Sequence, residues 1–217
     1  MVSTSNLSAL PDIFSLRRLC QSLAMLDAIL SPEWNSRFDS FNHRWDEHSV
    51  LASMRNGSGD HFFVLFNTFG AIIKGFAHES LMSPYQVQPP HTWPGVLDDV
   101  PTEFAGFLSE PAFSIEDTTF CLWRTFSDSS WHRGDIEFPD SQNLDGSREL
   151  LLMFDGKART YRDWAEDYYE QPVDLEVVSL VYGHHPLSGD IVRELNPELT
   201  LDDLTKDAQE IGYPNLQ

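Results

Sequence analysis

The chain has 217 residues, of which 41% are hydrophobic and 12% aromatic, enough apolar side chain to fill a sizeable core and to exclude global disorder. It carries 34 Asp and Glu against 14 Lys and Arg, a net charge of −20. A surface of that sign repels nucleic-acid phosphate and anionic lipid, so we expect neither nucleic acid nor a membrane as a partner.

No apolar run approaches the roughly 18 residues of a membrane span, and the first residues lack the basic start of a secretory signal. We therefore expect a cytoplasmic protein. Its two cysteines, Cys20 and Cys121, lie in apolar segments and are interpreted as reduced, buried thiols.

The first third of the chain predicts one helix followed by a β meander. Apolar residues recur at helical spacing over 11–30 and stop at Ser31-Pro32. Short runs rich in aromatic and branched residues then predict four strands, with Gly- and Asn-containing turns between consecutive runs. These strands are expected at 38–45, 49–54, 61–67 and 71–78.

The middle of the chain predicts a loop, a helix and a second β region. Prolines make 83–94 a surface connection, because proline lacks a backbone donor and fixes φ. Apolar residues recur at helical spacing from Leu97 to Leu108, and the helix itself is expected to begin near Pro101, which suits its first turn. Strands are expected at 118–126, 131–138 and 149–154.

From Thr160 onward the pattern becomes helical. Thr160 with Asp163 resembles a capping box, Asp174 begins a segment that is either helix or strand, and Ser188 caps a short helix. A last helix is expected to open at Thr200 and Asp203 and to close at Gly212.

Runs of strands followed by runs of helices indicate the α+β class rather than a doubly wound sheet. We predict antiparallel strands packed against helices with a helical C-terminal section, in a single domain without a cofactor. Its sub-regions are 1–96, 97–159 and 160–217.

The charge is distributed unevenly along the chain. Residues 1–96 hold 8 acids and 6 bases, whereas residues 97–217 hold 26 acids and 8 bases. Acids interleaved with aromatic residues are typical of a surface that steers and anchors a cationic protein. The leading hypothesis is a non-enzymatic protein that binds a basic protein partner. The candidate partner-binding residues are Asp135, Glu137, Glu166, Asp167, Tyr168 and Glu170.

An enzyme or a small-molecule-binding protein is the alternative, with a pocket near His78, Glu79 and Trp93. His184 and His185 could join His78 at a metal, but no HExxH spacing supports this. The acid pairs Glu116-Asp117 and Asp135/Glu137 suit glycoside hydrolysis, although acids on a solvated face are the favoured interpretation. A third explanation of the acidity is a saline habitat.

Three short pieces of the chain are similar in layout to the SUKH superfamily, which includes many bacterial toxin-immunity proteins. The pieces are VPTEFAGFL at 100–108, the segment at 150–154 and TYRDWA at 160–165. The resemblance implies a cytosolic α+β protein that neutralises a partner by binding it, and it implies no catalytic residues.

Overall fold

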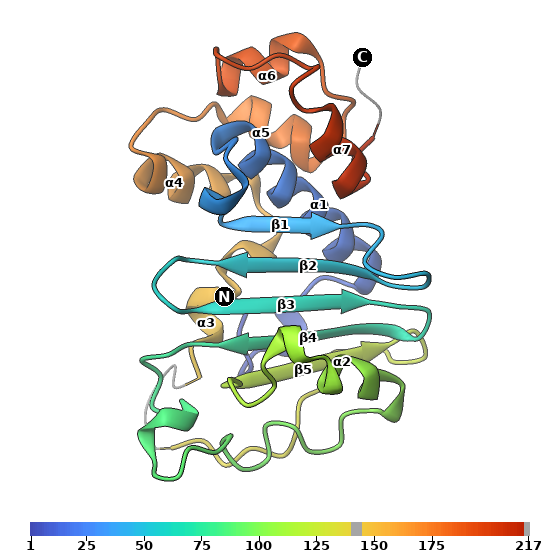
Figure 1. Ribbon diagram of the computed structural model, residues 1–217, viewed down its shortest axis with the longest axis vertical. Helices are drawn as coiled ribbons and strands as arrows, with labels where there is room; N and C mark the ends of the chain where they lie inside the picture. Colours follow the sequence, from blue (N-terminus) through green and yellow to red (C-terminus); the bar gives the residue numbers. More distant parts are fainter. Residues whose placement is uncertain (140–144, 215–217) are drawn as a thin grey trace.

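A five-stranded antiparallel sheet forms the centre of the molecule, with its strands side by side in chain order (Figure 1). The computed structural model describes residues 1–139 and 145–214. The strands are β1 (Asp39–Asn42), β2 (Val50–Arg55), β3 (His61–Phe66), β4 (Gly70–Phe76) and β5 (Phe120–Thr125). Together with the helices of the C-terminal part, this sheet confirms the predicted α+β class.

Side chains of asparagine set the turns of the meander. Asn56 Oδ1 accepts the backbone N–H groups of Ser58 and Asp60 between β2 and β3. Asn67 Oδ1 accepts those of Phe69 and Gly70 between β3 and β4. Such bonds hold the chain in a tight reversal, and the predicted meander is confirmed.

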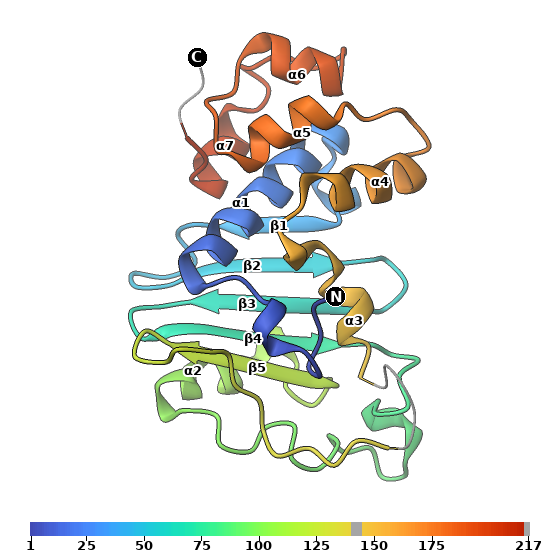
Figure 2. The same ribbon diagram turned by 180° about the vertical axis from the view of Figure 1, so that it is seen from behind.

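Two apolar layers cover the two faces of the sheet. The predicted first helix is α1 (Ile13–Leu30), which Asp12 caps by accepting two backbone N–H groups, and it crosses one face (Figure 2). A second buried cluster, which includes Ile72, Phe107 and Trp123, covers the other face beneath α2 (Ala105–Ser109). Because β4 lies between both layers, all seven of its residues are buried.

The C-terminal helices pack beyond β1 and around α1, at the top of Figure 1. Ser188 accepts a backbone N–H at a helix start, as predicted. Asp174 does the same at the start of α5, so the segment that was expected as either helix or strand is a helix. The capping box predicted at Thr160 is wrong, because α4 begins earlier and Thr160 bonds Asp155 instead. Thr200 donates to Asp203 in a turn before α7. These helices are α4 (Ala158–Tyr169), α5 (Leu175–Tyr182), α6 (Gly189–Leu195) and α7 (Thr205–Ile211).

One buried carboxylate joins α1, β1 and α4. Asp27 Oδ2 accepts the backbone N–H groups of Phe38 and Asp39 at 2.8 and 2.7 Å. Its Oδ1 accepts the hydroxyls of Tyr161 and Tyr169 at 3.0 and 3.1 Å. Asp27 therefore holds the helical section on the sheet. The neighbouring Asp39 is buried without a described hydrogen-bond partner for its Oδ2.

Two expected strands are wrong. The run 131–138 makes a single bridge, between Trp123 and His132, and then leaves the sheet. The run 149–154 is helical, within α3 (Ser147–Leu150) and the 3-10 turn Leu152–Asp155. Its apolar residues are buried in the main core, and burial alone does not distinguish a short strand from a short helix.

Candidate functional site

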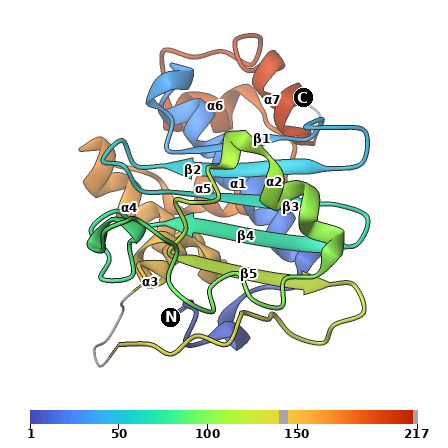
Figure 3. The ribbon, with the colours of Figure 1, turned by 60° about the horizontal axis from the view of Figure 1, so that its bottom comes forward.

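An open cleft of about 760 Å³ lies below β5, between two segments that are distant in sequence. Its walls come from 81–98, the proline-rich connection, and from 135–139. Figure 3, in which this end of the molecule comes forward, shows both segments outside the sheet. The volume is within the range of roughly 300–1,000 Å³ that is usual for ligand sites.

Buried residues and two glycines hold the segments together. Met82, Val96 and Ile136 lie in the second core cluster and anchor both walls. A Cβ at Gly134 would stand 1.8 Å from the carbonyl oxygen of Gly95, and a Cβ at Gly95 would stand 2.2 Å from that of Asp135. Only glycine permits this approach of backbone to backbone. This approach places residues 134 and 135 against Gly95, outside the sheet.

The cleft has apolar walls, and each of its two segments contributes an aromatic side chain. Trp93 donates its indole N–H to the carbonyl of Glu137 at 3.2 Å, which fixes the ring across the two segments. Phe138, on the other segment, also lines the cleft, and the guanidinium of Arg133 lies over its ring at 4.9 Å. Leu81 and Val87 are 57% and 40% exposed. Apolar surface of this kind in a concave site favours desolvated contacts with a guest.

The polar groups of the cleft are mostly anionic. Asp98, Asp135 and Glu137 line it with exposed side chains, and no Lys or Arg is among its described lining residues. Ser83 also lines it, 3% exposed, and its Oγ has no hydrogen-bond partner within the described residues. The cleft therefore offers three carboxylates, aromatic walls and one unused hydroxyl.

The structure separates the predicted partner-binding residues into two groups. Asp135 and Glu137 lie in the cleft, whereas the others lie on α4 or its C-terminal cap at the opposite end of the molecule (Figures 1 and 2). The group on α4 comprises Glu166, Asp167, Tyr168 and Glu170.

Two members of the α4 group make contacts within the fold. Glu166 accepts the backbone N–H of Val173 and lies near Arg162, and Tyr168 stacks on Trp164 at 4.9 Å. Asp167 and Glu170 are exposed. These two form no cleft with Asp135 and Glu137, so α4 is a separate acidic surface.

The residues of the alternative pocket also lie apart. His78 Nδ1 is 2.7 Å from Asp60 Oδ1, and the Glu79 side chain is 89% exposed. Neither lines any of the four clefts described for this structure, whereas Trp93 belongs to the acidic cleft. His184 Nε2 bonds the carbonyl of Arg18, and no group of three or more metal-binding side chains occurs in the described part of the chain.

A buried lysine that sequence reasoning missed lies on the same face of the sheet. Burial lowers the pKa of Lys74 to about 8. Its Nζ lies 2.6 and 3.0 Å from the carbonyls of Phe113 and Ser114 and 3.3 Å from His61 Nε2. All three N–H groups of the ammonium are thus used, so Lys74 pins the 113–114 loop to β4 rather than serving as a free nucleophile.

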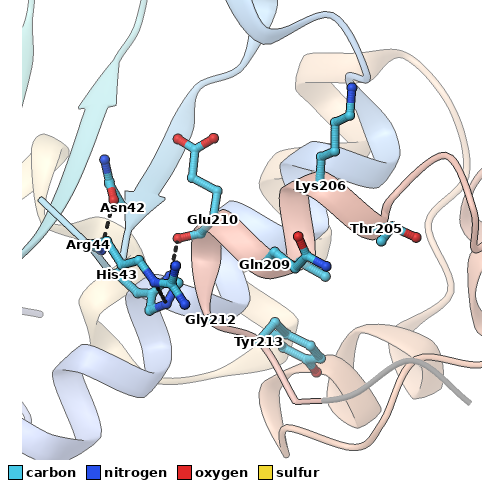
Figure 4. Close-up of a pocket in the computed structure, with 10 residues that line it drawn as sticks. Asn42, His43, Arg44, Thr205, Lys206, Gln209, Glu210, Gly212 and Tyr213 are labelled. Atoms are coloured by element: carbon cyan, nitrogen blue, oxygen red, sulfur yellow. Dashed lines mark hydrogen bonds between the residues drawn. The ribbon is translucent and has the colours of Figure 1, made fainter.

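A second large cleft, of about 730 Å³, separates the β1–β2 connection from α7 (Figure 4). Arg44 Nε donates to His43 Nε2, and His43 Nδ1 bonds the carbonyl of Glu210. Figure 4 shows Lys206 pointing away from Arg44. Because its two cations do not converge, this cleft has no concentrated charge for an anion.

Comparison of the chain with protein-family models, with curated proteins and with solved structures finds no match. Among the described residues, no helix is both long and apolar enough to cross a membrane.

Proposed function

We propose that the protein is a non-enzymatic binding protein that takes a basic segment of a protein partner into the acidic cleft. The observation that carries this proposal is that Asp98, Asp135 and Glu137 line the same cleft as Trp93 and Phe138. Carboxylates attract and orient a cationic segment, while aromatic walls supply the contacts that exclude water.

The resemblance to immunity-type proteins of the SUKH superfamily supports a more specific form of the same proposal. The partner is then a nuclease toxin in the cytoplasm, and inhibition is by occlusion. A basic strand or loop from the rim of the nuclease groove enters the cleft, and the net charge of −20 opposes the approach of nucleic acid to the blocked groove.

Matched charge variants test the proposal. The probe is a labelled peptide in which arginine and lysine alternate with glycine, and fluorescence anisotropy measures its affinity. Asp135→Asn with Glu137→Gln should weaken binding about three- to thirtyfold, because it removes two exposed ion pairs worth up to about 1 kcal/mol each. Asp167→Asn with Glu170→Gln removes the same charge from α4 and should change affinity less than about twofold.

Salt supplies the second readout of this experiment. Raising ionic strength from about 50 to about 500 mM shortens the screening length and should weaken binding to the parent more than to the cleft variant. Equal losses in both variants would show that only the overall charge attracts the peptide. A loss confined to the α4 variant would move the site to α4.

A further inference from the structure

The unused hydroxyl of Ser83 is the least expected group in the cleft. Burial removes water from Ser83 Oγ, and no described residue replaces it. A buried polar group without a partner costs free energy, and natural proteins satisfy most such groups. Because Ser83 lines the cleft, a rotation of its side chain would present this hydroxyl to a hydrogen-bonding guest.

The two carboxylates of 135–139 stand at alternate positions. Asp135 and Glu137 are exposed, and Ile136 between them is buried, so both side chains leave one side of the run. In extended backbone such residues are about 6.6 Å apart. Among the described residues, no backbone N–H of 133–138 donates to a backbone carbonyl. An extended guest with cations two residues apart matches this spacing.

Arginine suits the remaining features better than lysine. A guanidinium is planar, stacks on aromatic rings and is more weakly hydrated than an ammonium, so it loses less on entering a partly apolar site. It also carries five N–H donors, enough for a carboxylate and a hydroxyl at once.

We infer that the guest of the acidic cleft is arginine, presented at alternate positions of an extended peptide, with Ser83 Oγ as an acceptor. The inference rests on the proposed function and narrows the partner from any basic segment to an Arg-x-Arg segment.

Three capped peptides test the inference by calorimetric titration at low salt. They carry arginine, lysine or citrulline at two positions separated by one glycine, and citrulline keeps the shape of arginine without its charge. We expect the arginine peptide to bind at least about tenfold more tightly than the lysine peptide, and the citrulline peptide not to bind. Equal binding of arginine and lysine would overturn the arginine inference and leave the proposed function intact. Absence of binding by both would overturn the proposed function itself.

Ser83→Ala tests whether the Ser83 hydroxyl contributes to peptide binding without contributing to the stability of the fold. The variant should bind the arginine peptide about three- to tenfold more weakly, because it loses one net hydrogen bond of about 1 kcal/mol. Its unfolding temperature should stay equal or rise, because no described residue hydrogen-bonds the hydroxyl. Ser58→Ala, at an exposed turn, is the control and should change neither quantity. Unchanged arginine affinity in Ser83→Ala would overturn the role of the hydroxyl.

Discussion

Asp27→Ala should lower the free energy of unfolding by about 3–5 kcal/mol, the range found when one partner of a buried polar network is removed. The substitution leaves four hydrogen-bond donors without their acceptor. They are the backbone N–H groups of Phe38 and Asp39 and the hydroxyls of Tyr161 and Tyr169. Urea denaturation followed by circular dichroism measures the change.

Asp27→Asn is the matched control. Its Oδ1 can accept from the backbone N–H groups, and its amide can donate to the hydroxyls of Tyr161 and Tyr169, so we expect a loss of only about 1–2 kcal/mol. Equal losses in the two variants would contradict the hydrogen-bond account and would indicate that the charge of Asp27 is what stabilises the fold.

Raising the pH from about 5 to about 8 should destabilise the protein. Burial raises the pKa of Asp27 from 3.8 to about 6, and burial together with the neighbouring Asp27 charge raises the pKa of Asp39 well above 3.8. The folded state therefore holds these protons more tightly than the unfolded state. The stability they contribute is fully present below pH 3.8 and is lost as the pH rises through the folded values. For Asp27 alone, the shift corresponds to about 3 kcal/mol.

Asp39→Asn separates the ionisation of the buried carboxyl group from the general repulsion among the acids, which also grows with pH. The amide remains neutral, so stability should fall less between pH 5 and pH 8, and the variant should be more stable than the parent at pH 8 by about 1–3 kcal/mol. Asp167→Asn removes an exposed charge and should leave the slope with pH unchanged. Parallel pH profiles for Asp39→Asn and the parent would show that Asp39 does not carry a buried proton.

The meander was predictable because its turns are local. Asn56 and Asn67 form their hydrogen bonds within four residues, so sequence alone contains the information that sets the turns. The 131–138 run was not predictable as a loop, because its path depends on contact between Gly95 and Gly134, far apart in the chain. Its alternating pattern is genuine, since Ile136 is buried in the second core cluster, but its backbone makes only the Trp123–His132 bridge to the sheet.

The candidate site was predictable only in part. The density of acids predicted one partner-binding surface that contains Asp135, Glu137 and the α4 residues. Trp93 was predicted separately, as part of the alternative pocket. The fold instead joins Trp93 to Asp135 and Glu137 and places α4 at the other end. Asp98 and Ser83 carry no sequence signal of their own, since an Asp-Asp pair and a serine before proline are ordinary in loops. The role of Asp27 could not be predicted from its place in a helical apolar run, because it depends on the packing of α4 against α1.

Nuclear magnetic resonance titration of the full chain with the arginine peptide shows where the guest binds, because backbone amide shifts locate it without assuming a site. We expect the largest shift changes in 81–98 and 133–139, and we expect them to disappear in Asp135→Asn with Glu137→Gln. Changes centred on α4, or spread evenly over all acidic surfaces, would contradict binding in the acidic cleft.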